Sequence, residues 1–173
     1  MTIDELKDLS EFVLKSGVET LQKKHGDLCA RFHLVKADGG MDIVFIEGDL
    51  INQPTAKEIM AREIRRRAAA GELQAVVLLS DVFVGRMSEQ NEQIRRRLGL
   101  NVEQSAELGL CKRQEAVMVS LDSPIYRRIV TQDYTRRGRE IELGERKEMD
   151  DTKPGSRASG RFMSFFNHEA ARV

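Results

Sequence analysis

Along this chain the spacing of apolar residues switches between a helical period and a strand period, and that switch is the strongest constraint on its fold. Residues 3–24 carry one apolar face at helical spacing, preceded by a capping box of Thr2 and Glu5. Residues 29–36 alternate instead, so Phe32 and Leu34 share one face of a strand. The chain therefore begins with a helix and then enters a sheet.

Turn-forming residues separate the next elements. Residues 37–40 supply the backbone freedom of a tight hairpin, after which residues 41–47 return as a second strand. Thr55 and Glu58 give a capping box for a further helix, and residues 74–84 then form a strongly apolar strand. Strand, helix and strand in this order predict a crossover unit.

The second half of the chain predicts mainly antiparallel strands. We expect a short polar helix at 88–98, strands at 114–121 and 125–131, and a short edge strand at 141–144. Residues 99–112 are expected to form an irregular insertion. Together these elements predict an α+β fold, with a single mixed, mostly antiparallel sheet of about five strands and helices on one face.

The length of 173 residues suits one domain, which buries roughly 70% of the surface of its unfolded chain. We place this single domain at residues 1–149. Residues 150–173 shift to Asp, Lys, Pro, Gly, Ser and Arg, which predicts a flexible tail. The tail carries an aromatic cluster that we expect to dock on this chain or on a partner: Phe162, Met163, Phe165 and Phe166.

Both faces of the predicted sheet are apolar at its centre. The second strand places Ile43 and Phe45 on one face and Val44 and Ile46 on the other. Two long helices suffice for one face, and an uncovered apolar patch usually marks a contact site. Either the aromatic cluster folds back over the second face or another subunit covers it, and we expect a homodimer with twofold symmetry.

Charge and hydropathy exclude several classes of partner. The 28 basic and 28 acidic side chains cancel, so the chain as a whole has no field that attracts nucleic acid or anionic lipid. The first residues lack the pattern of a secretory signal, and the longest purely apolar run, residues 75–79, is too short to cross a bilayer. These features predict a cytoplasmic protein that does not bind membranes.

Familiar catalytic motifs are missing from the sequence. No strand is followed by a Walker or GxGxxG phosphate loop, and no GxSxG elbow occurs. Cys29 and Cys111 lie outside any paired-cysteine motif, and His25, His33 and His168 lack metal-ligand spacing. We expect reduced thiols, no metal and no cofactor.

Arginine runs suggest nucleic-acid binding, because phosphate contacts are made chiefly by Arg and Lys. The runs at 65–67 and 95–97 follow acidic residues at four-residue spacing on predicted helices, which explains them structurally. The later arginines border a predicted hairpin and have few acids near them. They are candidates for a local anion site: Arg127, Arg128, Arg136, Arg137 and Arg139.

A pair of carboxylates is the best candidate for catalysis. Asp81 ends the central strand, and Glu115 begins the strand expected beside it, with Arg113 close to it in sequence. Such a pair is able to hold a divalent cation or to work as an acid and a base. The alternative is that both acids form ion pairs with Arg86 or Arg113 at the rim of the sheet.

Two short motifs carry a resemblance. Residues 77–83 read Val-Leu-Leu-Ser-Asp-Val-Phe, and residues 113–119 read Arg-Gln-Glu-Ala-Val-Met-Val. This pattern resembles a loose set of uncharacterised bacterial proteins that join a helix, a strand ending in a Ser, acidic, aromatic pattern, and a strand opening with Arg and Glu. Phe83 stands where those proteins often have a tryptophan, and residues 87–111 are longer than usual. The resemblance spans residues 40–145, implies the fold and brings no known activity.

These observations favour a non-enzymatic binding or assembly module that acts through the apolar sheet face, the arginine-rich hairpin and the aromatic cluster. Two alternatives stay open. One is a metal-assisted hydrolase or nuclease that uses Asp81 and Glu115 with Arg113. The other is a weak nucleic-acid-binding protein.

Overall fold

The computed structural model describes residues 1–26, 28–48, 53–150 and 165–166. Within this part the elements follow one another as α1 (Ile3–Lys23), β1 (Arg31–Lys36), β2 (Met41–Phe45), α3 (Pro54–Ala69), β3 (Leu73–Arg86), α4 (Glu89–Leu98), α5 (Val102–Glu107), β4 (Lys112–Asp122), β5 (Arg127–Arg137) and β6 (Glu140–Asp150). None of the helices described is both long enough and apolar enough to span a membrane.

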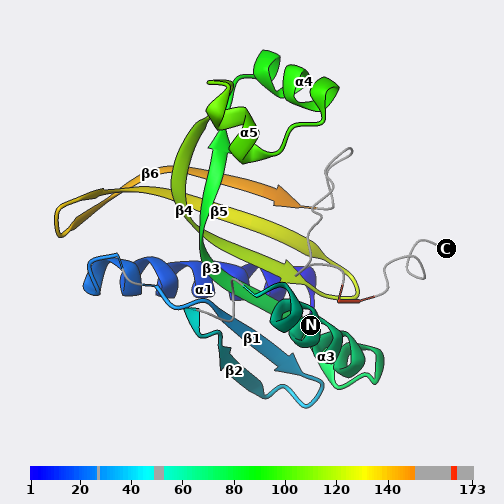
Figure 1. Ribbon diagram of the computed structural model, residues 1–173. Coiled ribbons are helices and arrows are strands. Elements are labelled where there is room, and N and C mark those ends of the chain that lie inside the picture. Colours follow the sequence, from blue (N-terminus) through cyan, green and yellow to red (C-terminus); the bar gives the residue numbers. More distant parts are fainter. Residues whose placement is uncertain (27, 49–52, 151–164, 167–173) are drawn as a thin grey trace.

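The strands of the described residues form one six-stranded sheet in the order β2-β1-β3-β4-β5-β6 (Figure 1). Every neighbouring pair is antiparallel, because the crossover through α3 leaves β1 between β2 and β3. The α+β prediction is confirmed, with one strand more than expected. The outermost strand, β6, is longer than the short edge strand expected at 141–144. Its charged residues show little apolar alternation, and pairing with β5 extends it.

Helices cover both faces of the sheet, so the prediction of helices on one face is wrong. α1 packs on the face that contains Val77 and Leu79, whereas Ala61 of α3 packs on the face that contains Val76 and Leu78 (Figure 1). Consecutive strand residues point to opposite faces, which separates the two cores. The period of a helix shows that it has an apolar side, but not which face of the sheet that side will cover.

The helix starts are only partly those of the sequence analysis. The capping box before α1 is present, with the Thr2 hydroxyl accepting from the Glu5 amide at 3.2 Å. α3 instead begins at Pro54, whose fixed backbone angle suits the first turn of a helix, and not at the box expected from Thr55. The predicted irregular stretch 99–112 contains the short helix α5. With α4 it forms an arm at the end of the β3–β4 ribbon (Figure 1).

Two members of the aromatic cluster lie in the second core. Phe165 and Phe166 are buried, and the ring of Phe165 meets that of Phe32 edge-on, with centroids 6.1 Å apart. The amide nitrogens of both phenylalanines lie near the buried Asp122 Oδ2, at 2.5 and 3.3 Å. Phe162 and Met163 lie outside the described residues, as does most of the tail predicted at 150–173.

Candidate functional site

The two candidate carboxylates lie on neighbouring strands, on the face covered by α1. β3 and β4 pair Phe83 directly with Glu115, which places Asp81 diagonally beside that glutamate. Arg136 of β5 joins the two acids. Its Nη2 is 3.4 Å from Asp81 Oδ2, and its Nε is 3.1 Å from Glu115 Oε1. The predicted proximity is therefore present, but the cation is Arg136 in place of the expected Arg86 or Arg113.

Tyr134 completes this acidic cluster and was missed by the sequence analysis. Its buried hydroxyl donates toward Asp81, lying 2.9 and 2.8 Å from the two carboxylate oxygens, and it accepts from Arg136 Nη2 at 3.0 Å. Burial raises the pKa of Asp81, against the lowering effect of Tyr134 and Arg136. Burial, followed by the hydrogen bond to Asp81, also raises the pKa of Tyr134, so the phenol stays protonated at neutral pH. The sequence did contain a signal for Tyr134: it stands two residues before Arg136 on one strand, and residues two apart point to the same face of a sheet.

The turn that follows α1 lies against this cluster. Gly26 has a φ of 100°, and a Cβ added there would overlap Arg136 Nη1. His25 Nδ1 lies 3.0 Å from the carbonyl oxygen of Arg139 in the β5–β6 hairpin. A guanidinium near the carbonyl end of a helix is electrostatically favoured. Arg136 thus acts as the chain's own counterion for Asp81 and Glu115.

A metal role has little geometric support at this place. The described residues contain no group of three or more His, Cys, Asp or Glu side chains arranged to hold a metal ion. Arg113, the third catalytic candidate, stacks on the ring of Phe83, with 3.9 Å between its guanidinium carbon and the ring centroid. The chemistry that the arrangement supports best is ion pairing, and the hydrolase hypothesis stays an untested alternative.

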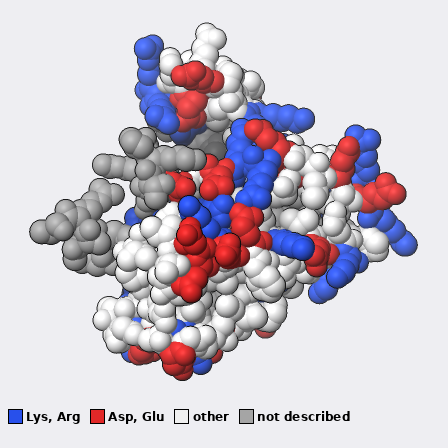
Figure 2. Space-filling model, turned by 180° about the vertical axis from the view of Figure 1, so that it is seen from behind, with Lys and Arg blue, Asp and Glu red and all other residues white. Residues whose placement is uncertain are grey.

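The arginines proposed for anion binding are mostly paired with acids. Arg127 Nε lies 3.0 Å from Asp122, and Arg137 Nε lies 2.8 Å from Glu142. The buried Arg128 lies 2.8 Å from both Glu11 and Glu148. On the face seen from behind, basic and acidic side chains adjoin one another in the charged central band (Figure 2). Acids next to these arginines therefore balance much of the positive charge of the hairpin. Nucleic-acid binding by the hairpin stays a prediction.

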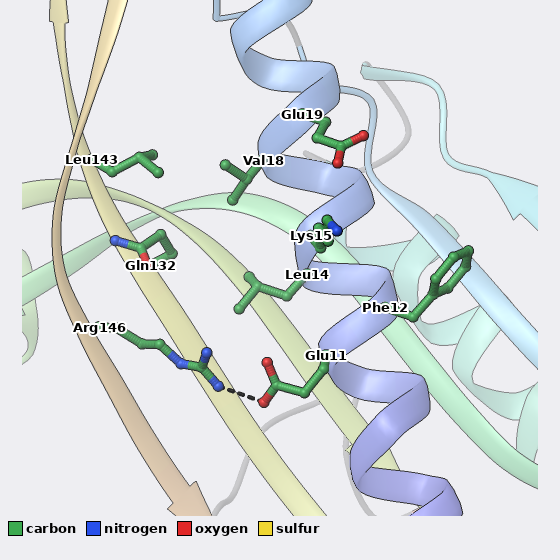
Figure 3. A pocket seen from close by; sticks show the side chains of 9 residues that line it. All are labelled: Glu11, Phe12, Leu14, Lys15, Val18, Glu19, Gln132, Leu143 and Arg146. Atoms are coloured by element: carbon green, nitrogen blue, oxygen red, sulfur yellow. Dashed lines mark hydrogen bonds and ion pairs between the residues drawn. The ribbon is translucent and has the colours of Figure 1, made fainter.

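A groove between α1 and the strands β5 and β6 has a volume of about 490 Å³. Leu14, Val18 and Leu143 form its apolar part, and an ion pair between Glu11 and Arg146 crosses one end (Figure 3). The lining of the groove contains both acidic and basic side chains. Its lining gives no preference for one class of ligand.

The outer strand β2 exposes a run of apolar side chains. Met41, Ile43, Val44 and Phe45 are 43, 50, 42 and 63% exposed. β2 is one border of the sheet and β6 is the other. β6 carries charges along most of its length, as protected edge strands usually do, whereas β2 carries Asp42 alone.

Three of these β2 side chains lie on the side of the sheet that carries α1. Pairing with β1 sets Ile43 opposite His33 and Phe45 opposite Arg31, on the side of the sheet where α1 lies. Phe12 of α1 is exposed at the rim of the groove, on the flank of the helix away from β5 and β6 (Figure 3). One helical turn later, Ser16 Oγ lies 3.4 Å from Arg31 Nη2, so this flank of α1 adjoins β1. In Figure 2 the surface below the charged band is largely uncharged.

Comparisons with protein-family models, with curated proteins and with solved structures gave no match for this chain. Its function is therefore inferred from the surfaces described above.

Proposed function

We propose that this protein is a non-enzymatic assembly module that forms a homodimer through the outer edge of β2. The observation that carries the proposal is an edge strand that exposes four apolar side chains and lacks the usual protection against pairing. An unpaired strand edge is a template for another strand, and pairing covers part of the exposed surface of these side chains.

The energetic gain comes mainly from apolar burial. Full burial of a side chain such as Ile or Phe is worth about 1.5–3 kcal/mol, and the β2 side chains are about half exposed in one subunit. Each therefore contributes roughly 1 kcal/mol when a second strand covers it. Backbone hydrogen bonds across the edge add to this and fix the orientation of the partner.

The other candidate surfaces support assembly less directly. Arg136 already forms ion pairs with the carboxylates at 81 and 115, and most of the arginines from 127 to 139 are engaged with acids. Phe165 and Phe166 are buried against this chain's own core, so their contact surface is used within the subunit. Among the described residues, β2 is a place where several exposed apolar side chains lie on one edge strand.

The test is the mass in solution, measured by light scattering on samples at micromolar concentrations. The chain has a mass of 19.6 kDa, and we expect a species of twice that mass. Ile43→Lys should give a monomer, because it places a charge at the centre of the edge. Met149→Lys is the matched control, since Met149 is 49% exposed on the opposite edge strand.

Two results of this measurement would contradict the proposal. A wild-type monomer throughout this concentration range contradicts the proposal, as does a dimer that Ile43→Lys leaves intact. Circular dichroism of each variant confirms that the substitution has not unfolded the subunit.

A further inference from the structure

We infer that the dimer contact is an antiparallel pair of β2 strands in which Ile43 lies opposite the partner subunit's Ile43. This inference rests on the proposed function and specifies its partner and register. It follows from the direction in which the backbone groups of β2 point, from the order of its side chains and from its charge.

The hydrogen bonds between β1 and β2 fix which residues face outward. The amide of Lys36 donates to the carbonyl of Gly40, and the amide of Ile46 donates to the carbonyl of Ala30, both at 2.8 Å. In an antiparallel ladder, hydrogen-bonded pairs alternate with pairs that are not bonded to each other. Even-numbered residues of β2 therefore bond to β1. The amide and carbonyl groups of Met41, Ile43 and Phe45 point away from the sheet.

One register satisfies all of these outward groups. With Ile43 on the twofold axis, Met41 lies opposite the partner subunit's Phe45, and Phe45 lies opposite the partner subunit's Met41. Every outward amide and carbonyl of the strand then has a partner. After a shift by one residue, the outward groups lie opposite partner residues whose own backbone groups already bond to β1. A shift by two leaves an end residue unpaired.

The side chains agree with this register. The three outward residues also share one face of the sheet, so the contact brings isoleucine against isoleucine and methionine against phenylalanine. Methionine sulfur and aromatic rings attract one another. Phe12 of α1 is exposed as well, on the flank of the helix that faces away from β5 and β6 (Figure 3).

Charge also favours a second copy of this chain. On the opposite face of β2, Asp42 would lie across from the partner subunit's Val44, so no like charges are directly opposed. Asp42 is already neutralised within its own subunit, with Lys36 Nζ and Arg67 Nη2 each at 3.4 Å. The strand is thus complementary to itself when reversed. This is the requirement of a twofold symmetric contact.

Cysteine cross-linking tests the register. In a chain whose own thiols are removed by Cys29→Ser and Cys111→Ser, the variants Ile43→Cys, Met41→Cys and Phe45→Cys are oxidised separately and in pairs. Directly opposed residues of a bonded antiparallel pair have Cα atoms about 5.5 Å apart, within the range of a disulfide. Residues offset by four positions along the strand are about 13 Å apart and out of reach.

We expect Ile43→Cys to cross-link alone, and Met41→Cys to cross-link with Phe45→Cys but not with itself. Self-cross-linking of all three variants indicates parallel strands and overturns the inference. Cross-linking of Met41→Cys with Ile43→Cys indicates a shifted register and overturns it too. A dimer that Ile43→Lys disrupts, yet that gives no cross-link at any of these positions, overturns the register and leaves the proposed function standing. A monomeric wild type overturns both.

Discussion

The hydroxyl of Tyr134 on β5 lies within hydrogen-bond distance of both carboxylate oxygens of Asp81 on β3, at 2.9 and 2.8 Å, although β4 runs between the two strands. The long tyrosine side chain spans the intervening strand on the face below α1. It ties the centre of the sheet to its outer half, and it holds a half-buried acid beside Arg136.

The raised pKa of Asp81 predicts how this acid affects stability. Because folding favours the protonated form, the contribution of Asp81 to the free energy of unfolding declines as pH rises above its unfolded value of 3.8. The stability of Asp81→Asn relative to the wild type should therefore increase from pH 3.8 up to the raised pKa of folded Asp81, and stay constant above that pKa. Urea unfolding of both proteins across this range measures the difference. A difference that is the same at every pH from below 3.8 to neutrality, or that falls as pH rises, contradicts the raised pKa.

His33 predicts a loss of stability in acid. Burial, with the nearby Arg31 charge, lowers the pKa of this histidine from 6.5 to about 4. The stability that depends on neutral His33 is complete above pH 6.5 and is lost as pH falls toward 4, at up to about 1.4 kcal/mol per pH unit. His33→Leu should flatten this part of the profile while folding normally at pH 8. An unchanged acid slope in the variant would be the contrary result.

The ion pair between Arg86 and the buried Asp133 predicts a large effect from removing one partner. Asp133→Ala should cost about 3–5 kcal/mol, because it leaves Arg86 partly buried without its acid. Replacing both, as Arg86→Met with Asp133→Leu, should recover much of that loss. Arg137→Ala is the control: its exposed pair with Glu142 should be worth no more than about 1 kcal/mol. Chemical denaturation of all four proteins tests the comparison.

The burial of Phe165 predicts that this residue contributes to the stability of the fold. Phe165→Ala should destabilise the protein by about 3–5 kcal/mol, because it leaves a cavity against Phe32 in the second core. Phe83→Ala removes an equally large but exposed ring and should cost about 1 kcal/mol. Thermal unfolding distinguishes the two. Equal effects would place Phe165 outside the core.

The sequence by itself determined the local elements and one long-range proximity. Apolar periods identified α1, the hairpin of β1 and β2, and the apolar centre of β3, since these patterns depend on neighbours a few residues apart. Asp81 and Glu115 were predicted side by side because β3 and β4 follow each other along the chain, and successive strands usually pair.

Only the tertiary structure decided which groups meet across greater distances. Arg136 reaches the two acids through the β4–β5 register, and α1 and α3 divide between the faces of the sheet. The position of β2 at the border also depends on the order of all the strands. Local preferences carry no information on strand order or register, because these depend on the total burial and hydrogen bonding of the assembled sheet.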